Sequence, residues 1–188
     1  MEIKLNYQNN LDSMYTNLLN LFDLEGEYQE RLSICTLCSF KNVSDASHQS
    51  KEFINKHMSP LLLKRKPFEE MYYQKIQSDL CHKLDEMKAY SEIDVETSRR
   101  LTTSSNDCIS LVQILIRDEI HLNVYFRSSD ILGALPIDLE FLSCLPKYFI
   151  DFLDTRNGLE GYEKFVDIKE LKEKAIQLNL MFGSLHKF

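Results

Sequence analysis

Apolar residues recur along this chain with two different spacings, which together predict both helices and strands. Recurrence every three to four residues is typical of an amphipathic helix, whereas strict alternation is typical of a strand with one buried face. Helical spacing covers residues 11–24, and Gly26 is a credible end for that helix. Further segments with helical spacing lie at 51–57, 66–90, 139–153 and 168–178, with Pro60, Pro67 and Pro146 as interruptions.

Two neighbouring segments, 109–116 and 120–126, carry the strongest strand pattern. In the second, polar and apolar residues alternate from Ile120 to Phe126, the period of a strand with two unlike faces. Arg117-Asp118-Glu119 separates the segments, which predicts an antiparallel hairpin. Further strands are expected at 32–43 and 180–182, and polar loops at 44–50, 102–107 and 154–161.

The mixture of strands and helices predicts an α+β protein. With 188 residues and 44% hydrophobic content, the chain is long enough to form one domain, residues 1–188, around a substantial core.

The charge balance narrows the range of partners. A formal net charge of −7 argues against general nucleic-acid binding, which basic surfaces drive. No run of about 18 apolar residues occurs, and residues 1–13 lack the apolar core of a signal peptide. We therefore expect a cytoplasmic protein that binds neither nucleic acid nor membrane.

The chain has five cysteines, which we interpret as reduced and mostly buried thiols. Cys35 and Cys38 have the CxxC spacing of zinc and redox sites, but no second such pair follows. We expect no metal site, and we expect Cys81 and Cys144 in the core because their surroundings are apolar.

The stretch from Ser98 to Asp138 carries the candidate chemistry. It contains Cys108 and, on either side along the chain, the pair Arg99-Arg100 and Arg127. A nearby arginine lowers the pKa of a thiol, and guanidinium forks suit phosphate oxygens. A thiol among arginines therefore favours a nucleophile that acts on a phosphorylated substrate.

The order of motifs here resembles the thymidylate synthase superfamily, which includes the deoxycytidylate and cytidylate hydroxymethylases. That family has an arginine pair, a cysteine followed by a glutamine, an Arg-Ser-x-Asp segment, a glycine, a Leu-Pro turn and a late Gly-x-x-His. The matching residues are Arg99, Arg100, Cys108, Gln113, Arg127, Ser128, Asp130, Gly133, Leu135, Pro136, Asp138, Gly183 and His186. The resemblance covers the middle and the C-terminal end of the chain.

The resemblance implies a role for each of these residues. Cys108 resembles the nucleophile that adds to C6 of a pyrimidine, which makes C5 able to attack a one-carbon unit. The resemblance also implies phosphate ligands within the subunit (Arg127, Ser128) and phosphate ligands donated across a dimer interface (Arg99, Arg100). It implies a polar network around the base and folate (Gln113, Asp130), in which Asp130 is a catalytic residue, a substrate-binding glycine (Gly133) and a ribose ligand (His186).

Asp138 carries the specificity argument. Thymidylate synthases have asparagine here, and in the family an aspartate goes with cytosine nucleotides. An ionised carboxylate only accepts hydrogen bonds, which suits the N4 amino group of cytosine. Asp138 is also expected to suit the N-cap of a helix starting near Leu139, and both roles are compatible.

Plainer interpretations stand beside each role. Cys108 is equally typical of a core cysteine, Arg99-Arg100 of a solvated pair, Gln113 of a residue that satisfies backbone groups, and His186 of an exposed residue. The chain also departs from the family: it has no tryptophan, Asp107 precedes the cysteine in place of proline, and Phe188 replaces a tyrosine. An adjacent carboxylate raises the pKa of a thiol, which opposes the lowering expected from Arg127.

The resemblance implies a layered α+β fold whose mixed sheet packs on its twin in a homodimer. It implies transfer of a hydroxymethyl or methyl group from 5,10-methylene-tetrahydrofolate to C5 of a pyrimidine nucleoside monophosphate, here dCMP or CMP. The alternatives are thymidylate synthesis from dUMP, and a non-catalytic nucleotide-binding or scaffold homologue.

Overall fold

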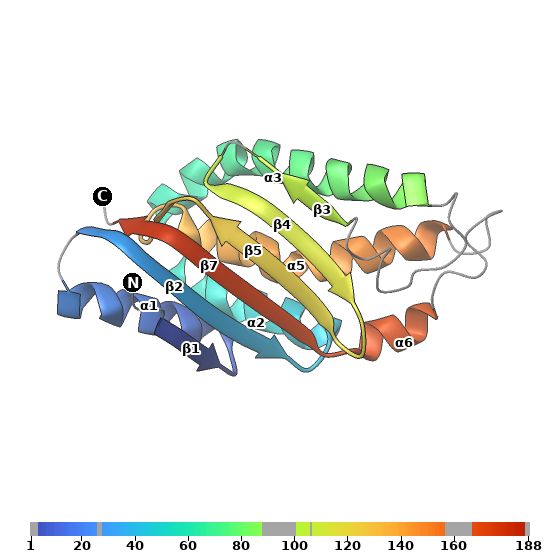
Figure 1. Ribbon diagram of the computed structural model, residues 1–188, viewed down its shortest axis with the longest axis horizontal. Coiled ribbons are helices and arrows are strands. Elements are labelled where there is room, and N and C mark those ends of the chain that lie inside the picture. The colour runs from blue at the N-terminus through green and yellow to red at the C-terminus, as the bar shows by residue number, and fades with distance from the viewer. Residues whose placement is uncertain (1–3, 26–27, 88–100, 106, 157–166, 187–188) are drawn as a thin grey trace.

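A computed structural model describes residues 4–25, 28–87, 101–105, 107–156 and 167–186. They form a seven-stranded mixed sheet in the order β1-β2-β7-β5-β4-β3, with the short β6 paired to β7 (Figure 1). The strands are β1 (Lys4–Gln8), β2 (Tyr28–Phe40), β3 (Thr102–Ser104), β4 (Ile109–Ile116), β5 (Ile120–Phe126), β6 (Ser129–Asp130) and β7 (Ile176–His186).

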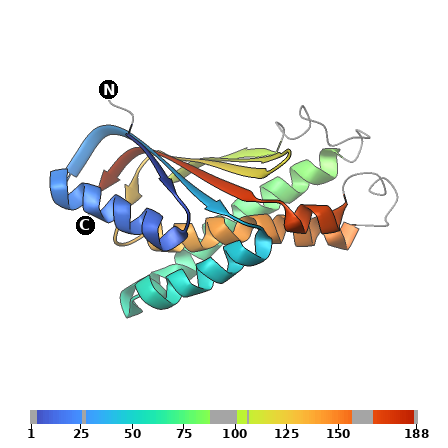
Figure 2. The same ribbon diagram turned by 90° about the horizontal axis from the view of Figure 1, so that it is seen from below.

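The helices all lie on one face of the sheet, and the other face carries no helix of the described chain (Figure 2). They are α1 (Leu11–Glu25), α2 (Val43–His57), α3 (Pro60–Met87), α5 (Leu135–Arg156) and α6 (Ile168–Glu173). This two-layer arrangement confirms the predicted α+β class. Within the described residues, no helix is both long and apolar enough to cross a membrane.

Alternation along the central strands divides the sheet into a core face and an open face. Leu122, Val124 and their neighbours on β4 and β7 are buried against the helices, while the residues between them point the other way. The predicted hairpin is confirmed, with β4 and β5 antiparallel in the register Gln113 to Asn123. The helix over 11–24 and the strand over 32–43 are confirmed in outline by α1 and β2.

The polar loop predicted at 44–50 is wrong, because α2 begins at Val43. The Asn42 side chain accepts a hydrogen bond from the Asp45 amide at 3.0 Å, and the Asp45 carboxylate accepts one from the Lys41 amide at 2.9 Å. The first bond satisfies an amide that a helix start leaves without a partner, and the second ties the residue before the N-cap to the first turn. One face of α2 is buried, and it includes Ala46, Ser50 and Phe53. Most other residues of the helix are polar, so this face is hard to recognise in the sequence.

Three other boundaries differ from the sequence-based expectation. Thr102–Ser104, expected as a turn, is an edge strand that pairs with β4. The helix expected at 168–178 stops at Glu173, and residues 176–186 form one long central strand. That strand is longer than expected because Gln177 and Asn179 alternate with buried Leu178 and Leu180, the period of a strand.

Of the three prolines expected to interrupt helices, Pro60 does lie at a break, since α2 ends at His57 and α3 begins at Pro60, but the other two are accommodated within helices. α3 continues through Pro67 and α5 through Pro146. A proline inside a helix removes one backbone hydrogen bond. At Pro67 the side chain is exposed, so water can satisfy the carbonyl group that the missing amide leaves unpaired.

Candidate functional site around Cys108 and Asp138

Cys108 lies directly before β4, and the end of β5 holds Arg127 beside it. The Arg127 amide donates to the Cys108 carbonyl oxygen at 2.9 Å, and β4 and β5 pair from Ile109 and Phe126 onward. The hydroxyl of the following residue, Ser128, hydrogen-bonds the Cys108 thiol. The hairpin therefore brings Cys108 together with Arg127 and Ser128, which follow it by nearly twenty positions in the sequence.

The surroundings of Cys108 raise the pKa of its thiol above the ordinary value. Burial is the largest cause, and the carboxyl groups of Asp138 and Glu69 add to it. The Ser128 hydrogen bond and the Arg127 charge lower the pKa but do not outweigh the rise. Arg127 therefore acts in the expected direction, yet the thiol stays protonated near neutral pH.

Asp138 lies in the first turn of α5, entirely inside the protein, with 1% of its surface exposed. Helix α5 begins at Leu135, so the predicted N-cap role of Asp138 is wrong: its amide already donates to the Ala134 carbonyl oxygen at 3.0 Å. The Tyr73 hydroxyl donates to Asp138 Oδ1 at 2.6 Å. The other oxygen, Oδ2, has no hydrogen-bond partner among the described residues.

Burial raises the pKa of Asp138 to about 8, although the Tyr73 hydrogen bond lowers it. Glu69 raises it further and Arg65 lowers it. At neutral pH the group is therefore mainly a neutral carboxylic acid, not the ionised acceptor assumed from the sequence. A neutral acid offers one donor and one acceptor.

Asp130, expected as a catalytic residue, is engaged in building the turn that leads into α5. Its Oδ1 accepts from the amides of Leu132 and Gly133, at 3.2 and 3.0 Å. Its Oδ2 lies 3.4 Å from an Arg65 guanidinium nitrogen. A Cβ at Gly133 would lie 2.0 Å from that Oδ2, so this position needs glycine for space. Asp130 and Gly133 thus shape the turn that positions Asp138. Both carboxylate oxygens of Asp130 have partners in this turn or on Arg65.

The remaining predicted site residues lie elsewhere or outside the described chain. Gln113 is on the open face, where its Oε1 accepts from Asn123 at 3.1 Å, so the structure does not bring it together with Asp138. His186 ends β7, with its backbone paired to Asp130. Arg99 and Arg100 lie outside the described residues.

Helix α3 supplies residues that the sequence motifs missed. Tyr72 donates to the Ile109 carbonyl oxygen at 2.6 Å, Tyr73 holds Asp138, and Glu69 and Arg65 act on the site electrostatically. They precede Cys108 by more than thirty positions in a segment without any motif. The pair of adjacent tyrosines on a helix was the one available signal.

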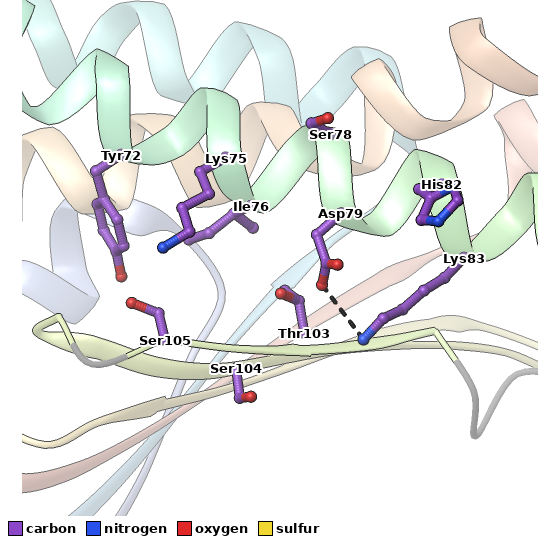
Figure 3. A pocket seen from close by; sticks show the side chains of 10 residues that line it. All are labelled: Tyr72, Lys75, Ile76, Ser78, Asp79, His82, Lys83, Thr103, Ser104 and Ser105. Carbon is purple, nitrogen blue, oxygen red and sulfur yellow. Dashed lines mark ion pairs between the residues drawn. The ribbon is translucent and has the colours of Figure 1, made fainter.

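A cavity of about 500 Å³ opens between α3 and β3, next to the loop that precedes Cys108. Lys75 and Asp79 point into it from α3, whereas Ser104 points away on the far side of β3 (Figure 3). Its polar groups are largely engaged: Asp79 pairs with Lys83 at 3.2 Å, and Ser105 donates to Asp107 at 2.7 Å. Cys108 and Asp138 do not line this cavity.

Cys35 and Cys38 lie on opposite faces of β2, because three positions along a strand reverse the side-chain direction. Cys38 is buried, and burial raises its pKa to about 12. No cluster of histidine, cysteine and acidic side chains within the described residues is arranged to hold a metal ion.

Comparison with known proteins gives no relative for this chain: no protein-family model and no curated protein sequence matches it. The functional argument therefore depends on the residues and their geometry.

Proposed function

We propose that this chain binds a pyrimidine nucleoside 5′-monophosphate, with cytosine preferred over uracil, and transfers a one-carbon unit to C5 through a Cys108 adduct. The observation that carries the proposal is the meeting of Cys108, Arg127–Ser128 and Asp138, from three separate segments, in the order the family resemblance requires. Cys108 would attack C6, Arg127 and Ser128 would hold the phosphate, and Asp138 would hold the base.

Because Asp138 is neutral, it offers a base a different set of hydrogen-bonding groups from an ionised carboxylate, but cytosine still complements them. With Tyr73 donating to Oδ1, the proton belongs on Oδ2, so the group presents an acceptor and a donor side by side. Cytosine presents a complementary N4 donor and N3 acceptor. Uracil also presents one donor and one acceptor there, so thymidylate synthesis from dUMP stays the alternative that binding must decide.

Folate, expected as 5,10-methylene-tetrahydrofolate, fits the cavity beside the Cys108 loop poorly. A pterin ring needs a flat apolar or aromatic wall, but the cavity beside the Cys108 loop has only Tyr72 and Ile76 of that kind among its lining residues. The steps that this chain's own residues support are therefore nucleotide binding and addition of the thiol, and no step is derived through the folate.

The open face of the sheet is the proposed homodimer contact. Across it run an apolar row, Leu111–Tyr125–Met181–Cys35, and an amide row, Gln113–Asn123–Asn179. Tyr125 is 38% and Met181 46% exposed, and the helices of the described ranges cover the opposite face. A second copy offering the same rows would bury both, and would bring its Arg99 and Arg100 to this subunit as the resemblance implies.

A non-catalytic nucleotide-binding or scaffold protein is the second candidate. One observation favours it: burial and two carboxyl groups raise the pKa of the Cys108 thiol, whereas a nucleophilic cysteine works as the thiolate.

Calorimetric titration with dCMP, CMP, dUMP and UMP tests the binding part of the proposal. We expect a cytosine nucleotide to bind more tightly, with the preference reduced in Asp138→Asn. Preference for dUMP would move the assignment to thymidylate synthesis, and no binding by any of the four would overturn the proposal.

Exchange of tritium from C5 of the bound nucleotide, without folate, tests the thiol. We expect slow exchange that disappears in Cys108→Ala and persists in Cys144→Ala, a matched cysteine variant. Tight binding without any exchange would support the non-catalytic candidate instead.

A further inference from the structure

A second cavity, of about 230 Å³, lies between α3 and α5 and belongs to no motif of the sequence. Tyr73, Phe141 and Ile137 form its apolar part, and polar side chains from both helices complete the lining: Lys66, Glu70, Gln74, Gln77, Glu140 and Cys144. A concave, partly apolar wall with a few polar groups is the usual form of a small-molecule site.

The Glu140 carboxylate gives the cavity an unsatisfied acceptor. Its Oε1 accepts from the Lys66 ammonium at 2.6 Å, while its Oε2 is buried and has no hydrogen-bond partner among the described residues. A buried polar atom without a partner is costly, and the cost disappears when a bound group supplies a donor. A ligand in the cavity whose donor reaches Oε2 would therefore remove this cost.

The charge of the lining selects the kind of donor. Glu70 and Glu140 carry two negative charges, and Lys66 carries the one positive charge. The lysine is already committed to Glu140, so the excess charge is negative. A protonated amine supplies both the missing donor and the compensating charge.

The apolar part selects the rest of the ligand. Tyr73 and Phe141 stack on each other, with ring centroids 4.1 Å apart and planes inclined by 6°. A hydrocarbon or aromatic body would lie against these side chains while its ammonium group reaches Glu140. We infer that the α3–α5 cavity binds a small amphipathic amine through the Glu140 carboxylate. This inference does not depend on the function of Cys108.

Calorimetric titration with benzylamine, and with neutral benzyl alcohol as the matched probe, tests the inference. We expect benzylamine to bind at least about tenfold more tightly than the alcohol, because one charge-assisted hydrogen bond distinguishes them. Glu140→Gln should remove this preference, whereas Glu86→Gln, which changes an exposed carboxylate of α3 outside the cavity, should leave it unchanged.

Alkylation of Cys144 locates the bound probe, because this half-buried cysteine lines the cavity. Benzylamine should slow the alkylation of Cys144 in the wild-type chain and leave that of Cys108 unchanged, with each site followed by peptide mass spectrometry. Equal binding of amine and alcohol, no binding of either, or protection of Cys108 in place of Cys144 would each overturn the inference. If Glu140→Gln lowers the thermal stability, Lys66→Met provides the second variant, and it should strengthen amine binding by freeing the carboxylate.

Discussion

At the scale of single residues, Asp138 has the most unusual surroundings in the candidate site. It is a carboxyl group without solvent, held on one side by Tyr73 and unpartnered on the other. Its pKa rises from 3.8 to about 8 on folding, so the folded chain binds a proton that the unfolded chain releases over this pH range.

This proton uptake predicts how stability changes with pH. Between about pH 4 and 8 the unfolded state is ionised at Asp138 and the folded state is not, so the free energy of unfolding falls as pH rises, by at most about 1.4 kcal/mol per unit from this group. Above about pH 8 both states are ionised and the fall ends.

We expect Asp138→Asn to lose this part of the pH dependence, as measured by urea unfolding from pH 4 to 9. Its stability relative to the wild type should therefore improve as pH rises. Asp118→Asn, at an exposed position in the turn between β4 and β5, is the control and should follow the wild-type curve. Parallel curves for Asp138→Asn and the wild type would show that the folded carboxyl ionises normally.

At this same scale, the sequence predicted some neighbours of Cys108 and missed others. Arg127 and Ser128 were predictable because a hairpin fixes which residue faces which, and the alternation around Asn123 defines that hairpin. Tyr73 was not predictable, because its contact with Asp138 depends on how two helices pack. The residues within one helix do not predict how that helix packs against another that is distant in the sequence.

At the scale of elements, α2 shows how capping can decide where a helix begins. Residues 44–50 read as a loop because they are mostly short polar side chains. Such side chains favour helix starts as well as turns, since both use the same local hydrogen bonds. The Asn42–Asp45 exchange resolves this ambiguity in favour of the helix.

Removing that cap should weaken the protein measurably. We expect Asn42→Ala to lower the free energy of unfolding by about 1 kcal/mol, because the Asp45 amide loses its acceptor. Asn42→Asp keeps an acceptor at the same place and should cost much less. Both values come from chemical denaturation at constant pH. An equal loss in the two variants would mean that the contact of Asn42 with Glu173, not the cap, is responsible.

At the scale of the whole molecule, the described helices cover one face of the sheet and leave the other open (Figure 2). The class of fold followed from the sequence because it depends on the number and type of elements. The strand order did not, since nothing local specifies that β7 lies between β2 and β5.

The open face predicts self-association that a single charge disrupts. We expect Met181→Asp to shift the chain from dimer to monomer in sedimentation velocity, because it places a carboxylate in the apolar row. Met71→Asp changes a more exposed methionine, on α3 and away from the apolar row, and should leave the dimer intact. If Arg99 and Arg100 of the second subunit contribute to the nucleotide site, the Met181→Asp monomer should also lose nucleotide affinity. A wild-type monomer, or full nucleotide binding by the monomeric variant, would contradict the proposed arrangement.

The central place of β7 also bears on how the chain acquires its fold during synthesis. Among the described strands, β1 and β2 on one side meet β5, β4 and β3 on the other only through β7. A growing chain therefore holds two unconnected half-sheets until residues 176–186 have left the ribosome. Pairing over such long sequence separations is slow, and the unpaired edges of β2 and β5 are exposed meanwhile to other chains. For this protein, the interval before β7 inserts is the period of greatest risk of aggregation.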